Sequence, residues 1–286
     1  MFVLRGTGMI LTLALLSGTA TAEEQKQSHQ DIVHAAISGA GSIPKQAKAL
    51  ALLAWPTEPG DPEVSAYARY MLVNYGRNAI QAIRGTITEA KPELQADVVK
   101  ALSEAFGQVH SGIPAGYLSG LEDAIWFGTR EAREVAILEI APFRFGPALL
   151  PIVDAATEDP ALLPVAISAL GTLGNDKARH FLGRVILEEA GDLRNSAAVA
   201  LARIGNRAHE VLRSALRSEE KELRLAAIRA LLPFADTDDL SALHTYAYDH
   251  ADDDPDTVRA VRESALVLEE TLAAEQAADA ASPPEE

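Results

Sequence analysis

Apolar and small residues recur along this chain with the spacing of one helix face, and the whole pattern repeats about seven times. Four, seven, eight and eleven places after Leu193, for example, stand Ala197, Ala200, Leu201 and Ile204. That spacing is typical of an amphipathic α-helix. The first apolar positions of the repeats follow one another at intervals of 30 to 38 residues, which predicts stacked structural units. These anchors are Val64, Leu94, Ala132, Leu162, Leu193, Leu223 and Val258.

Turn and capping residues divide each repeat into two helices. Proline or a capping side chain opens several repeats, at Asp61–Pro62, Lys91–Pro92, Thr129, Asp159–Pro160, Asp192 and Asp254–Pro255. Glycines that favour a helix end close several anchor helices, at Gly76, Gly107, Gly174 and Gly205. A second, shorter helix fits after the glycine, as around Ile80, Phe181 and Val211. The sequence therefore predicts an all-α chain of antiparallel helix pairs and no sheet.

The runs that begin Leu193-Arg194, Leu223-Arg224 and, in part, Val258-Arg259 resemble HEAT repeats, and specifically the short HEAT-like repeats of the phycobilisome-lyase type. The resemblance covers residues 43–272 and implies a right-handed α-solenoid of about seven stacked helix pairs. It also implies a structural role for Arg194, Arg224 and Arg259, whose side chains are expected to reach an acid in the adjoining repeat. The longer helix of each pair is expected to line the concave side.

The two ends of the chain carry other signals. Residues 1–22 have a basic start at Arg5, an apolar stretch and a small-residue site at Ala20–Ala22, which predicts a secretory signal cleaved after Ala22. The protein is therefore expected in the periplasm or outside the cell. Residues 23–42 form an N-terminal segment before the repeats, and residues 273–286 are predicted to be an acidic, disordered tail. No later stretch is apolar enough to suggest membrane insertion.

Charge is unevenly distributed along the chain, whose net charge is −16. From Asp236 onward the sequence contains fifteen acidic residues and only two basic ones, Arg259 and Arg262. Nucleic acid is therefore not an expected partner, because phosphate binding needs a basic stripe. The acidic end is interpreted as a solvated cap on the last repeat, and a dock for a basic partner stays open as an alternative.

Motifs for catalysis or metal binding are weak. Asp252, Asp254, Asp256 and Glu263 have the acid spacing of a calcium loop, but Thr257 stands where that loop needs glycine. His209–Glu210 is a single His–Glu step, whereas the di-iron hydroxylases with HEAT-like repeats carry two, so His209 is expected on a helix surface. No nucleotide-binding or nucleophile motif is present in the sequence. Neither a metal nor another cofactor is predicted.

These observations favour a non-catalytic scaffold that binds a protein or peptide on its concave face. The residues expected to point from that face are Tyr70, Lys100, Arg203 and Arg229. The glycine-rich stretch 107–129 is interpreted as an irregular third repeat, and a binding loop that carries Tyr117 and Trp126 stays open as the alternative. A lyase-type enzyme, or an assembly factor for a periplasmic cofactor protein, remains the alternative function.

Overall fold

The computed structural model describes residues 22–281 except residues 115 and 252–254. Regular structure in these residues is entirely helical, with fifteen α-helices and four short 3₁₀ helices. The predicted all-α class is confirmed for the part of the chain that the structure describes. The chain divides into two compact units, Met1–Ile140 and Ala141–Glu286, and each unit is described by itself.

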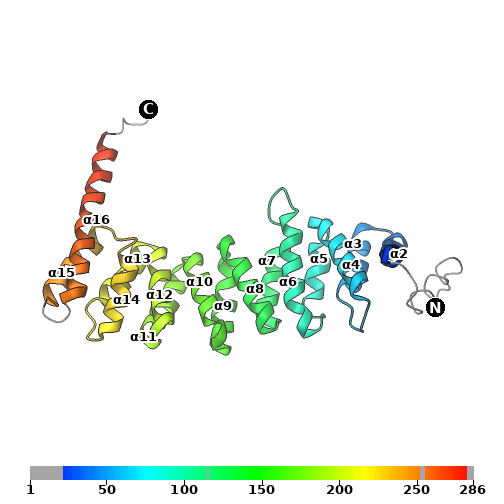
Figure 1. The fold of residues 1–286 in the computed structure, drawn as a ribbon, viewed down its shortest axis with the longest axis horizontal. Helices are drawn as coiled ribbons and strands as arrows, with labels where there is room; N and C mark the ends of the chain where they lie inside the picture. The colour runs from blue at the N-terminus through cyan, green and yellow to red at the C-terminus, as the bar shows by residue number, and fades with distance from the viewer. Residues whose placement is uncertain (1–21, 115, 252–254, 282–286) are drawn as a thin grey trace. The chain divides into compact units, whose positions relative to one another are not determined.

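Unit 1 is a two-layered stack of helices in which sequence neighbours are also spatial neighbours (Figure 1). Helices α2, α4, α6 and α8 contact one another in succession, and α3, α5 and α7 form the second layer in the same way. The helices are α2 (Ala22–Ala40), α3 (Ile43–Ala54), α4 (Pro62–Asn74), α5 (Ile80–Thr86), α6 (Pro92–Gly107), α7 (Tyr117–Phe127) and α8 (Arg130–Ile140).

Unit 2 follows the same principle. Helices α10, α12 and α14 contact one another in order, while α9 contacts α11 and α13 contacts α15 in the other layer. The last helix, α16, packs on α15. The helices are α9 (Leu149–Glu158), α10 (Leu163–Leu173), α11 (Asp176–Glu188), α12 (Gly191–Ile204), α13 (Asn206–Ala215), α14 (Lys221–Leu231), α15 (Thr237–Asp249) and α16 (Pro255–Ala281).

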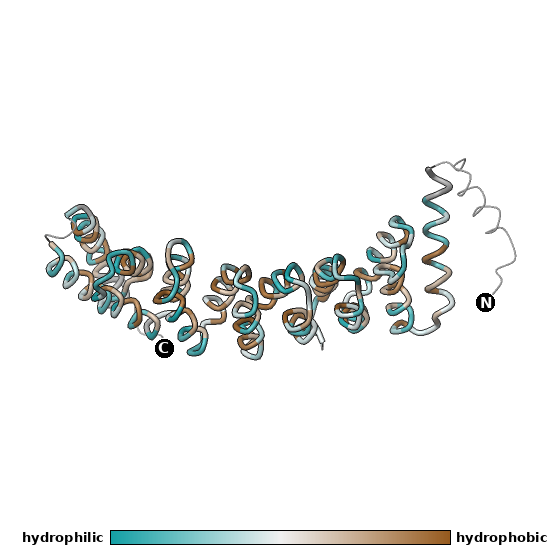
Figure 2. Tube along the Cα trace, turned by 90° about the horizontal axis from the view of Figure 1, so that it is seen from below, coloured by the Kyte–Doolittle hydropathy of each residue, from teal (hydrophilic) through white to brown (hydrophobic). Residues whose placement is uncertain are grey.

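The predicted apolar stripes are the packed faces of these helices. Ala197 and Leu201 of α12 are fully buried, and Ala227 and Leu231 of α14 are buried almost completely. Figure 2 shows hydrophobic and hydrophilic residues alternating along the helices, as amphipathic helices require. Because one helix cannot bury its stripe alone, the core of each unit is continuous from one helix pair to the next.

Several helix ends form for the reasons that the sequence indicates. The Asp61 carboxylate accepts a hydrogen bond from Glu63 N at 2.9 Å, and Pro62 is the first residue of α4. Gly174, at the end of α10, has a φ of +67° in the left-handed region that favours glycine. Gly107 differs from this expectation, because it is the last residue of α6 and Gln108 caps the helix with a φ of −81°.

The ends of the chain are more helical than expected. Helix α2 packs on α3 and α4 and so extends the stack ahead of residue 43. Helix α16 continues to Ala281, so residues 273–281, which the sequence assigns to the tail, are helical in the structure. An alanine-rich sequence favours helix even where it is acidic. Residues 1–21 of the predicted signal sequence lie outside the described residues. Residues 282–286 of the predicted tail also lie outside them.

Candidate functional site

The four residues predicted to point from the binding face are all exposed. Tyr70 has 63% of its surface exposed. The side chains of Lys100, Arg203 and Arg229 are also exposed. They lie on the layer of even-numbered helices, with Tyr70 and Lys100 in unit 1 and Arg203 and Arg229 in unit 2. Each unit therefore carries two of the four candidate residues, and each pair is described within its own unit.

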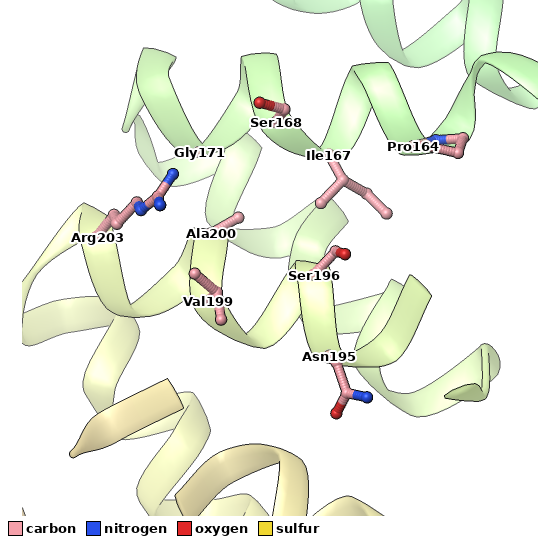
Figure 3. A pocket seen from close by; sticks show the side chains of 9 residues that line it. All are labelled: Pro164, Ile167, Ser168, Gly171, Asn195, Ser196, Val199, Ala200 and Arg203. Carbon is pink, nitrogen blue, oxygen red and sulfur yellow. The ribbon is translucent and has the colours of Figure 1, made fainter. Parts of the chain in front are cut away.

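The surface in unit 2 contains a groove between α10 and α12. Its volume is about 360 Å³. Figure 3 shows Arg203 at one end of the groove beside Gly171, and Pro164 and Asn195 at the other end. Its lining residues, four from α10 and five from α12, are Pro164, Ile167, Ser168, Gly171, Asn195, Ser196, Val199, Ala200 and Arg203.

Small residues form the floor of this groove. Gly171 of α10 faces Ala200 of α12 so closely that a Cβ atom added to Gly171 would lie 2.8 Å from Ala200 Cβ. Ile167 and Val199 add apolar surface to the walls, and Ser168 and Ser196 add hydroxyl groups. The groove can therefore hold a small apolar side chain and hydrogen-bond the backbone on either side of it.

Arg203 gives one end of the groove a positive charge. It is exposed, and within the described residues no acidic side chain forms an ion pair with it. Arg194, on the same helix, has only 6% of its surface exposed and pairs with Glu220. The two arginines of α12 therefore have different roles, since only Arg203 offers its charge to solvent.

The three repeat-position arginines behave differently from one another. Arg194 donates to the Ile186 carbonyl at 3.0 Å and pairs with Glu220, the residue before α14, as the HEAT resemblance implies. Arg224 is 7% exposed and donates to the carbonyl oxygens of Ser218 and Glu219, both at 2.8 Å. Arg259 is exposed on α16, so it lacks the burial that the other two share.

Helix α7 occupies Tyr117–Phe127 of the stretch predicted as a binding loop, so that interpretation needs correction. Tyr117 and Trp126 both lie on α7, and Tyr117 has only 1% of its surface exposed. The Tyr117 ring stacks on Phe106 with 4.2 Å between ring centroids, and burial raises the pKa of its phenol despite the hydrogen bond with Ser103. Tyr117 is therefore a core residue, and Trp126 is half-buried.

The sequence did not indicate the most buried polar cluster, which joins α13 to α15. His209, expected on a surface, has 2% of its surface exposed. Its Nδ1 atom lies 2.6 Å from Asp239 Oδ2 and its Nε2 atom 2.9 Å from the Ala202 carbonyl oxygen. Both ring nitrogens face acceptors, so both contacts are hydrogen bonds only when the ring carries two protons. Arg213 donates to the other oxygen of Asp239 at 2.6 Å.

Asp236 completes this cluster as the cap of α15. Its carboxylate accepts a hydrogen bond from Asp239 N at 2.8 Å, and the Asp239 carboxylate accepts one from Asp236 N at 3.0 Å. Burial alone would raise the pKa of Asp236, but the hydrogen bond from the Asp239 backbone and the charge of Arg213 outweigh it and lower that pKa. Among the described residues, His209, Asp236 and Asp239 also bring ligand atoms within 4.8 Å of one another. A metal ion bound there would have to displace Arg213 from Asp239 and break the two hydrogen bonds between Asp236 and Asp239. The arrangement therefore fits an internal ion pair better than a metal site.

Comparisons with known proteins leave the chain without a family. No protein-family model and no curated protein matches it. Two crystal structures of engineered proteins, Northeast Structural Genomics Consortium targets OR497 and OR329, align with 91% of this chain. For OR497 the alignment covers 80% of that chain at 19% identity and a TM-score of 0.39. For OR329 it covers 94% at 17% identity and a TM-score of 0.26.

Within the described part of the chain, no helix is both long and apolar enough to cross a bilayer.

Proposed function

We propose that this protein is a non-catalytic, HEAT-like helical-repeat scaffold that binds a polypeptide segment on the layer of even-numbered helices. The observation that carries the proposal is the groove between α10 and α12. It lies on the helix face that the repeat pattern assigns to binding, and it includes Arg203, one of the four residues chosen from sequence. Its floor and walls suit a side chain and the adjoining peptide backbone, as in other peptide-binding grooves.

The size and openness of the groove argue for a segment rather than a folded surface. About 360 Å³ accommodates a few side chains. A groove with one floor of small residues favours a narrow ligand, because Gly171 and Ala200 let the ligand approach the helix backbones closely. Affinity would then come from a few contacts along the groove, with Arg203 as the residue of the type enriched at binding hot spots.

The test is selection from a displayed library of random peptides, followed by binding measurements on variants. Val199→Trp should fill the groove and abolish binding of the selected peptides. Leu187→Trp is the matched control, because Leu187 is 66% exposed and lines a groove of the other layer between α11 and α13. Failure to select any peptide, or equal binding by the Val199→Trp variant, would refute the proposed groove.

We also propose that the protein is secreted or periplasmic. The support is the signal-like sequence of residues 1–22. Mass spectrometry of the protein from cell fractions tests this, with Glu23 as the expected first residue of the exported form. A chain that remains in the cytoplasm with an intact N-terminus would exclude export.

A further inference from the structure

We infer that the segment bound by the α10–α12 groove is acidic, with a carboxylate seated at the Arg203 end. This inference rests on the proposed function and specifies the chemistry of the ligand. The protein carries a net charge of −16, yet the exposed faces of α12 and α14 present Arg203 and Arg229.

Neither arginine has an acidic partner among the described residues. Most other arginines of unit 2 are engaged, since Arg194 pairs with Glu220 and Arg213 with Asp239. On α12, the residues one turn before Arg203 are Val199 and Ala200, and the helix ends one residue after it, at Ile204. On α14, Leu225 and Ala226 precede Arg229 by one turn, and that helix ends at Leu231. Helical neighbours therefore do not neutralise these two guanidinium groups.

The groove itself contains no carboxylate that could compete for Arg203. Its lining residues other than Arg203 are all uncharged. The nearest exposed acids of these helices, Asp192 on α12 and Glu222 on α14, are at the opposite, N-terminal ends. An α-helix rises 1.5 Å per residue, so Asp192 and Arg203 are separated by about 16 Å along the axis of α12.

Remote negative charge does not cancel this local field. The acids that give the chain its net charge are concentrated from Asp236 onward. At physiological ionic strength the Debye length is about 8 Å, so exposed charges at larger distances are largely screened. A carboxylate at Arg203 would instead meet a planar donor group at short range.

The arrangement in Figure 3 also gives the ligand a direction. Arg203 marks one end, Ile167 and Val199 provide apolar walls, and Asn195 marks the far end with an amide. An acidic residue that precedes or follows a small apolar residue would satisfy these groups together. A basic segment would place like charge against Arg203, which is unfavourable.

Three fluorescent probe peptides of equal length test the inference by anisotropy. One alternates Glu and Val, the second replaces every Glu with Gln, and the third replaces every Glu with Lys. We expect the Glu peptide to bind at least about tenfold more tightly than the Gln peptide, and the difference to shrink as salt is raised. The Lys peptide should not bind.

Charge-reversal variants locate the effect. The double variant Arg203→Glu with Arg229→Glu should lose the preference for the Glu peptide. Arg217→Glu is the matched control, because Arg217 is exposed in unit 2 but lines the separate groove between α13 and α15. Each protein is checked for an unchanged helical spectrum before binding is measured.

The outcomes separate this inference from the proposed function. If the Gln and Glu peptides bind equally, and Val199→Trp abolishes both, then the groove binds peptides without charge preference and the inference is wrong. Equal effects of the Arg217→Glu control and the double variant would also overturn it. If neither the probes nor any library peptide binds, the proposed function fails as well.

Discussion

Two helix contacts in unit 2 are formed by different kinds of residue, one by small residues and the other by polar and charged ones. Helices α10 and α12 meet through Gly171 and Ala200, which have almost no side chain to fill the space between them. Helices α13 and α15 meet through His209, Arg213 and Asp239, whose polar atoms bond one another. The first contact leaves an open groove beside Arg203, which pairs with no acid among the described residues, whereas the second uses its charges internally. Charge on a repeat protein is therefore informative about binding only after its internal partners are known.

The largest expected effect is at the polar contact. Asp239→Ala leaves His209 and Arg213 without their shared carboxylate and removes half of the α15 capping box. Removing one partner of a buried pair costs about 3–5 kcal/mol in the free energy of unfolding. Urea denaturation followed by circular dichroism measures this. Asp238→Ala, at an exposed position of the same helix, is the control, and a similar loss in both variants would show that the cluster is not special.

A smaller loss is expected at the close helix contact. Gly171→Ala puts a Cβ atom 2.8 Å from Ala200 Cβ, and relieving such overpacking costs about 1–3 kcal/mol. Gly183→Ala in α11 is the matched control, because its Cβ would meet only Val211 Cγ1 at 3.7 Å. The control should gain up to about 1 kcal/mol, since alanine favours helix over glycine. Thermal or urea unfolding of the two variants should therefore shift in opposite directions, and equal shifts would contradict the close approach.

Acid should weaken the polar contact selectively. The pKa of Asp236 is lowered from its usual value of 3.8, so its stabilising contribution is complete above that value and is lost as the pH falls through the folded-state pKa. We expect the free energy of unfolding to fall more steeply below about pH 4 in the wild type than in Asp236→Asn. Parallel curves for the two proteins would show that the Asp236 carboxylate does not contribute.

The smallest stability effect is expected for Arg203. Arg203→Ala should change the free energy of unfolding by no more than about 0.5 kcal/mol, because the side chain is exposed and forms no ion pair within the described part of the chain. Arg194→Ala, two turns or more earlier on α12, should cost more because it breaks the bonds to Ile186 and Glu220. Urea denaturation of the pair sharpens the distinction between a binding arginine and a structural one. Equal losses would place Arg203 among the structural residues.

Local patterns in the sequence predict most of the fold, because helix formation and capping depend on near neighbours. The stripes around Ile80, Phe181 and Val211 became α5, α11 and α13. The glycine-rich stretch before Thr129 was misleading, since glycine can break a helix or permit close packing. Gly120 does the latter in α7, where an added Cβ would lie 2.9 Å from Leu102 Cδ2.

Features that depend on residues far apart in sequence could not be predicted in the same way. The burial of His209 requires Asp239, which belongs to the following repeat 30 residues later. The exposed candidates were easier, because Arg203 and Arg229 follow from the helical period of their own helices. The groove between α10 and α12 was not predicted, although Gly171 and Ala200 stand in the sequence, since only the packed structure shows that they face each other.

The bonds of His209 also bear on cooperativity. The imidazole touches the Ala202 carbonyl in α12, while the Asp239 that it contacts is in α15 and is shared with Arg213 of α13. A single network of polar side chains thus connects three helices. In a linear array of repeats, such coupling between neighbours decides how far local unfolding spreads. The amides of α12, α13 and α15 should consequently exchange with solvent hydrogen as one subglobal unit rather than fraying helix by helix from the C-terminal end.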